Sequence, residues 1–126
     1  MENLTTHDWA FVAAGIMGCI TAVVHGLLLQ KLMVKPIREQ VRLDRNSARL
    51  VPLLLHFSTI FWFLGGVALI IAPSLSDAST VLALSVFVGT LYSFGAVGNF
   101  WGTRGKHPGW MLLVITLALI VYGASA

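Results

Sequence analysis

Four long apolar stretches, separated by short polar or charged segments, dominate the pattern along the chain. They cover residues 9–30, 50–72, 80–101 and 109–124. A helix needs about 20 apolar residues to cross the ~30 Å hydrocarbon core of a bilayer, and each stretch comes close to that length. The last is the shortest, which suits a helix with little tilt or a locally thinned bilayer. The pattern predicts an all-α integral membrane four-helix bundle, with four transmembrane helices running up-down-up-down in one domain over residues 1–126.

Composition favours the same conclusion. Hydrophobic residues make up 57% of the chain and charged residues only 10%, whereas about a quarter of the residues in a soluble domain are charged. A water-soluble domain of this size buries only part of its surface and could not hide so much apolar area. We therefore expect the excess apolar surface to face the lipid bilayer.

The distribution of charge predicts an orientation. All eight Lys and Arg residues lie in two connections, six of them between positions 31 and 49 and the other two at Arg104 and Lys106. The N-terminal segment and the connection at 73–79 carry only acids. Those acids are Glu2, Asp8 and Asp77. The positive-inside rule places basic connections in the cytoplasm, so both termini are expected on the non-cytoplasmic side, with a bacterial inner membrane as the expected compartment.

The first basic connection predicts more than a loop. After Pro36 it contains no Gly or Pro, and its arginines recur at helical spacing. They are Arg38, Arg42, Arg45 and Arg49. On a short amphipathic cytoplasmic helix these guanidinium groups would form one stripe. Such a stripe could bind anionic lipid headgroups, at about 1 kcal/mol per residue, or an acidic partner protein. Nucleic acid would need a larger basic surface, so no nucleic-acid partner is expected.

Small residues at regular spacing predict close helix packing. In the first apolar stretch they recur every fourth residue, at Ala14, Gly18, Ala22 and Gly26. The third stretch contains a GxxxG element formed by Gly98 and Gly102. Small residues let the backbones of two membrane helices approach closely. These stripes could pack within the bundle, against a second copy of the chain, or against a larger membrane complex.

The apolar stretches contain no Asp, Glu, Lys or Arg, which disfavours ion-driven transport because such pathways usually use intramembrane charges. Two histidines remain: His25 lies six residues before Lys31, and His56 lies seven residues after Arg49. On antiparallel helices they would reach the same depth, as bis-histidine ligation of a b-type haem requires. The alternative is that each histidine hydrogen-bonds to a carbonyl or to a hydroxyl such as that of Thr59. The sequence offers no further obvious ligands beside these two histidines, so it does not predict a metal site.

A line of polar residues seven apart runs along the third stretch, at Ser85, Tyr92, Asn99 and Lys106. Polar side chains in hydrocarbon need partners, so this line is expected to face inward. Together with the histidines it predicts a polar cluster in the cytoplasmic half, containing His25, His56, Thr59, Tyr92 and Asn99. The cluster could hold a ligand headgroup or a quinone, or it could only link helices by hydrogen bonds. His7 and His107 are interpreted as solvated loop residues.

Two short segments resemble a known family. The segment from Asn46 to Pro52 is similar to the Asn-x-x-Glu-x-x-Pro element of the membrane-associated eicosanoid and glutathione metabolism family. Residues 91–95 (Leu-Tyr-Ser-Phe-Gly) are similar to its tyrosine-containing third-helix motif. The resemblance implies a glutathione-transferase-like membrane enzyme. The chain departs from it at Arg49, where the family has an acid, and at Gly89, where an arginine is expected, and glutathione binding relies on both charges.

Three functional hypotheses follow from the sequence. The first is a small non-catalytic membrane protein, an accessory or assembly subunit that packs against other helices. The second is a small b-type cytochrome with haem held by His25 and His56. The third is the glutathione-transferase-like enzyme that the resemblance implies.

Overall fold

The computed structural model describes residues 3–126, so Glu2, which contributed to the predicted orientation, lies outside the described part. The described part of the chain is 86% helical and contains no strand. In chain order its elements are α1 (Thr6–Leu29), the π-helical turn η1 (Gln30–Val34), α2 (Lys35–Gln40), α3 (Arg45–Ile71), the 3-10 turn η2 (Ala72–Ser74), α4 (Ala78–Thr103) and α5 (Gly109–Ala124).

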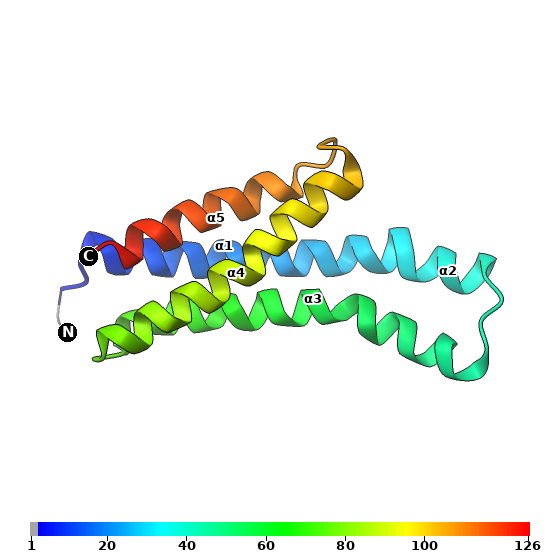
Figure 1. Cartoon of the computed structure of the whole chain (residues 1–126), viewed down its shortest axis with the longest axis horizontal. Coiled ribbons are helices and arrows are strands. Elements are labelled where there is room, and N and C mark those ends of the chain that lie inside the picture. Colours follow the sequence, from blue (N-terminus) through cyan, green and yellow to red (C-terminus); the bar gives the residue numbers. More distant parts are fainter. Residues whose placement is uncertain (1–2) are drawn as a thin grey trace.

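The long helices lie side by side, and consecutive helices run in opposite directions (Figure 1). α1 packs against both α3 and α5, whereas α4 packs against α5 and less extensively against α3. The start of α1 and the end of α5 lie at the same end of the molecule as the turn between α3 and α4 (Figure 1). The connection between α2 and α3 lies at the opposite end and projects beyond the turn between α4 and α5.

The first basic connection differs from the prediction. Helix continues without interruption from α1 through η1 into α2, and it ends at Gln40. Pro36 does not stop this helix, because the preceding turn widens: the Lys35 N–H bonds to the carbonyl of Gln30, five residues back. A π-turn relieves the clash that a proline ring makes with the backbone of a regular α-helix. The short helix predicted between the first two membrane helices is therefore present as α2, but it is continuous with α1 and carries only one of the four arginines.

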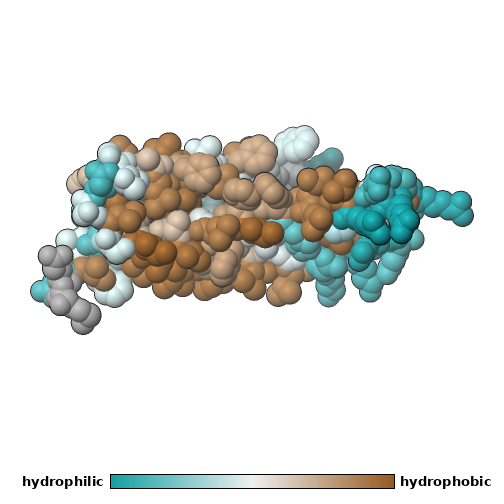
Figure 2. All heavy atoms as spheres, turned by 90° about the horizontal axis from the view of Figure 1, so that it is seen from below, coloured by the Kyte–Doolittle hydropathy of each residue, from teal (hydrophilic) through white to brown (hydrophobic). Residues whose placement is uncertain are grey.

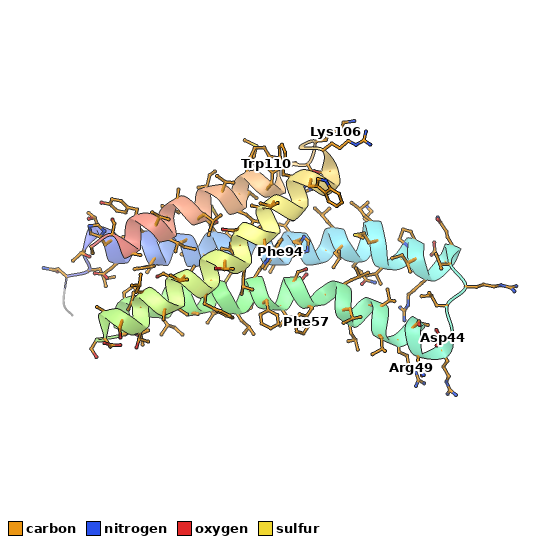
Figure 3. The ribbon with its side chains drawn as sticks, in the orientation of Figure 1. Asp44, Arg49, Phe57, Phe94, Lys106 and Trp110 are labelled. Atoms are coloured by element: carbon orange, nitrogen blue, oxygen red, sulfur yellow. The ribbon has the colours of Figure 1, made fainter. Side chains whose placement is uncertain are left out.

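The four arginines of the predicted stripe are divided between three segments of the chain. The chain leaves the helix at Val41, and the Asp44 carboxylate caps a new helix by accepting hydrogen bonds from the N–H groups of Asn46 and Ser47. The four arginines thus lie on α2 (Arg38), in the connection (Arg42) and on α3 (Arg45 and Arg49). Lys31, Lys35 and Arg38 instead share a face of the first helix, where they line one shallow groove. Figure 3 shows Asp44 and Arg49 at the projecting end.

Apolar side chains cover most of the surface. The stretches Thr6–Gln40, Arg45–Ser74 and Ala78–Thr103 are each long and apolar enough to cross a membrane. α5 is equally apolar but has only 16 residues. In Figure 2 a broad hydrophobic band occupies the middle of the molecule, and the hydrophilic residues gather mainly at one end. That end carries the basic connection between α2 and α3.

Glycine allows the closest helix contact, between α1 and α3. A Cβ added at Gly15 would lie 2.5 Å from the carbonyl oxygen of Gly66, and one added at Gly66 would lie 2.7 Å from the carbonyl oxygen of Gly15. The two backbones therefore touch directly. Farther along, the ring of Tyr92 occupies the space above Gly18, and the indole of Trp62 lies against Gly95. These contacts form the centre of the core.

Candidate functional site

A cavity of about 290 Å³ lies beneath the turn between α4 and α5. Its walls come from α1, η1, α4, the α4–α5 turn and α5, and Trp62 contributes from α3. Most of the lining is aliphatic, from residues such as Leu28, Leu29 and Leu112. The polar lining residues are Thr21, His25, Asn99, Thr103 and His107. A mainly apolar cavity with a few converging polar groups is typical of small-molecule sites.

Thr21 is the most deeply placed of these polar groups. It is 5% exposed, and its hydroxyl oxygen is buried without a hydrogen-bond partner in the described part of the chain. A buried hydroxyl is normally bonded, often to the carbonyl four residues earlier in its own helix. Sequence reasoning missed Thr21, although its position four residues before His25 places both side chains on one helix face.

His107 lies in a loop, as the sequence suggested, but it is not fully solvated. It is half-buried and lines the cavity. Its Nδ1 accepts a hydrogen bond of 3.1 Å from the N–H of Gly109, at the start of α5. The neutral ring therefore carries its proton on Nε2, which makes that nitrogen a donor.

His25 forms a hydrogen bond with a serine of α3. Its Nε2 lies 3.1 Å from the hydroxyl oxygen of Ser58, and that hydroxyl donates its proton to the carbonyl of Leu55. When the Ser58 hydroxyl donates to Leu55, Nε2 of His25 donates to Ser58 and Nδ1 of the neutral ring carries no proton. The imidazole also packs on the indole of Trp62, with ring centroids 4.4 Å apart. The hydroxyl partner is thus Ser58 and not Thr59.

His56 makes a separate contact across the same pair of helices. Its Nε2 lies 2.9 Å from Oε1 of Gln30, the first residue of η1, which directly follows α1. Ligation of a haem through both Nε2 atoms would break this bond and the one between His25 and Ser58. A porphyrin also needs a gap between α1 and α3, yet a Cβ on Gly26 would lie 2.7 Å from Cγ2 of Thr59. The geometry favours hydrogen bonding as the role of both histidines.

The other members of the predicted polar cluster are divided between neighbouring environments. Asn99 lines the cavity and donates from Nδ2 to the Gly95 carbonyl in its own helix. Tyr92 is fully buried and donates to the carbonyl of Trp62. The hydroxyl of Thr59 is buried without a partner in residues 3–126, but Thr59 lies between α1 and α3 and does not line the cavity.

The opposite end of the molecule contains a further histidine contact. His7 lies in the first turn of α1, where Thr5 and Asp8 form a capping box. Its ring stacks on Tyr122 of α5 at a centroid distance of 4.6 Å, and its Nδ1 lies 2.8 Å from the Tyr122 carbonyl oxygen. His7 therefore links the two ends of the chain, contrary to its interpretation as a solvated loop residue.

The two predicted small-residue stripes have different surroundings. The stripe of α1 is used inside the molecule: Ala14 and Ala22 are fully buried, while Gly18 faces Tyr92 and Gly26 faces Thr59. The GxxxG element of α4 faces outward. A Cβ added at either of its glycines, Gly98 and Gly102, would meet no atom within 4 Å.

The comparisons with known proteins add no relative. No protein-family model, curated protein or solved structure matches the chain. The resemblance to the eicosanoid and glutathione family therefore rests on the two short segments alone. Within the fold, Tyr92 bonds to Trp62, and Arg49 lies thirteen residues before Trp62 on α3, about 20 Å along the helix. The two segments of the resemblance do not meet at one site.

Proposed function

We propose that this chain is a non-catalytic integral membrane protein, a bundle of four transmembrane helices that serves as a helix-packing subunit. The observation that carries the proposal is the open GxxxG face of α4. Gly98 and Gly102 lie where an added Cβ would touch nothing, so a helix from another chain could approach the backbone there. Within the molecule the same type of stripe, on α1, is already filled by neighbouring helices.

Large side chains border this open face. Phe94 is 83% exposed and Trp101 is 82% exposed, and both lie within one turn of a glycine of the pair. Figure 3 shows Phe94 on the outer surface of α4. Two large residues flanking a pair of glycines produce a ridge beside a groove, and the ridge of one helix can fit the groove of an identical helix. A second copy of this chain is therefore the partner that we propose, with α4 packed on α4 about a two-fold axis.

The charge distribution supports membrane insertion with a fixed orientation. The basic residues of the α2–α3 connection lie at the hydrophilic end in Figure 2, beyond the apolar band. Both termini lie at the other end (Figure 1). We propose that the basic end is cytoplasmic and that both termini are outside, in a bacterial inner membrane. Lys31, Lys35 and Arg38 would then meet the anionic headgroups of the inner leaflet.

Self-association can be tested by counting subunits in lipid vesicles through single-molecule photobleaching. The wild-type chain should give two bleaching steps per particle, and Gly98→Leu combined with Gly102→Leu should give one. Ala118→Leu is the matched control, because Ala118 is also an exposed small residue of an apolar helix but lies on α5. A wild-type chain that bleaches in single steps, or a control that dissociates as readily as the glycine variant, would contradict the proposal.

Orientation can be tested with single cysteines in a Cys19→Ala background. Cysteine at Ser125 should react with a membrane-impermeant maleimide added outside intact cells, and cysteine at Arg42 should react only after lysis. Both positions lie outside the helices. Labelling of position 42 in intact cells, or protection of position 125, would reverse the proposed topology.

A further inference from the structure

We propose that the cavity beneath the α4–α5 turn binds the ring headgroup of a neutral membrane quinone. The inference rests on the proposed membrane insertion, because the ligand would arrive from the lipid phase. It does not depend on self-association through α4. Two observations carry it. The hydroxyl of Thr21 has no hydrogen-bond partner among residues 3–126, and several polar groups surround an otherwise apolar cavity.

The buried hydroxyl identifies what the ligand must provide. Burying a hydroxyl without a hydrogen-bond partner is unfavourable, because its contacts with water are lost and not replaced. Thr21 lines the cavity, so a ligand atom there could accept its proton. Nε2 of His107, whose ring is fixed by the N–H of Gly109, offers a second donor from the α4–α5 turn. The ligand should therefore carry two hydrogen-bond-accepting oxygens.

The lining also defines the charge of the ligand. None of the described residues that line the cavity is Lys, Arg, Asp or Glu. A charged headgroup, such as a carboxylate or a phosphate, would lose its hydration without gaining a counter-ion. A neutral ring with carbonyl oxygens avoids this cost. Asn99, whose Nδ2 already bonds to the Gly95 carbonyl, keeps its Oδ1 as an acceptor for the hydroxyl of a reduced ring.

The shape and access of the cavity fit a lipid-soluble ring. Trp62, itself 5% exposed, lines the cavity, so a ring bound there would contact an aromatic side chain. Val24, Leu32 and Leu112 line the cavity while remaining exposed on the apolar surface. A hydrophobic tail could pass between them into the surrounding lipid. A volume of about 290 Å³ holds a headgroup but not a whole lipid.

Binding can be measured by tryptophan fluorescence, because quinones quench indoles on contact. A reporter carrying Trp9→Phe, Trp101→Phe and Trp110→Phe retains Trp62 as its single tryptophan. Titration of reporter vesicles with decylubiquinone should give saturable quenching. Thr21→Val should weaken binding by about 3- to 10-fold, the effect of one hydrogen bond. Thr59→Val is the matched control: its hydroxyl is also buried and unpartnered in the described chain but lies outside the cavity, so its affinity should stay within about 2-fold.

Two further arms keep the test decisive. Leu112→Phe should weaken binding by filling the cavity, which covers the case in which Thr21→Val fails to fold. Decylbenzene, which lacks the ring oxygens, should compete poorly with decylubiquinone. Quenching that rises linearly with quinone in the lipid, equal affinities of the two threonine variants, or effective competition by decylbenzene would each overturn the proposal. Gly98→Leu with Gly102→Leu should leave binding unchanged, which separates this test from that of self-association.

Discussion

The hydroxyl of Tyr92 on α4 donates a hydrogen bond of 2.7 Å to the main-chain carbonyl of Trp62 on α3. It is a fully buried contact between two helices that otherwise pack only moderately against each other. The same ring lies against Gly18 of α1, so one side chain connects three helices. A glycine at position 18 is what gives the ring its space.

Removing the Tyr92 hydroxyl should destabilise the protein less than filling the space that the Tyr92 ring occupies. Tyr92→Phe should lower the free energy of unfolding by about 1 kcal/mol, because one neutral hydrogen bond is lost. Gly18→Ala should cost about 1–3 kcal/mol, since its Cβ would overlap the Tyr92 ring. Unfolding in mixed micelles, followed by circular dichroism, measures both. A larger loss for Tyr92→Phe than for Gly18→Ala would contradict this description of the core.

The contact between α1 and α3 should be intolerant of a single added methyl group. In Gly15→Ala the new Cβ would lie 2.5 Å from the Gly66 carbonyl oxygen, so the helices must separate at a cost of about 1–3 kcal/mol. Gly89→Ala is the control, because its nearest atom, Cδ2 of Leu117, lies 3.9 Å away. The control should be neutral or should stabilise by about 0.5–1 kcal/mol, as alanine favours helix. The same unfolding assay compares them, and equal losses would show that the two helices are not in backbone contact.

The pair of Gln30 and His56 should show energetic coupling. We expect a double-mutant cycle with Gln30→Leu and His56→Leu to give a coupling energy of about 0.5–1.5 kcal/mol, the range for one hydrogen bond.

An absorption spectrum of the purified protein tests the cytochrome alternative. A Soret band that disappears in His25→Ala and His56→Ala would replace hydrogen bonding by haem ligation as the role of these residues.

The start of α4 should lose stability only in strong acid. Hydrogen bonds from Thr80 and Ser79 lower the pKa of the Asp77 carboxyl from 3.8 to about 2. A lowered folded-state pKa means that the contribution of this cap is complete above pH 3.8 and is lost as the pH falls toward 2. Asp77→Asn keeps a capping side chain but cannot titrate. Melting temperatures between pH 5 and pH 2 should therefore fall more steeply in the wild type than in this variant, and parallel curves would contradict the prediction.

Much of the helical architecture could be predicted from the sequence, because the length of an apolar stretch and its lack of charged residues depend on local composition alone. The predicted starts and ends of the apolar stretches lie within a few residues of the long helices, except at the charged ends of α1 and α3, where the helices extend further. Those extensions were missed because the basic residues between positions 31 and 49 were assigned to a connection between two membrane helices. On the α1 side, helix also continues through Pro36. A π-turn, which depends on the backbone around it, accommodates the proline.

The sequence by itself determined the all-helical class, the long apolar segments and the gathering of basic residues in two connections, because these follow from composition and period. Only the tertiary structure decided which polar groups meet. His25 bonds to Ser58 and not to Thr59, and His107 lines the same cavity as Thr21. Gly98 and Gly102 of α4 remain uncovered by the described residues. The physical reason is that rotation of each helix about its axis is set by packing against neighbours, through contacts such as that of Gly15 with Gly66, and no local pattern specifies it.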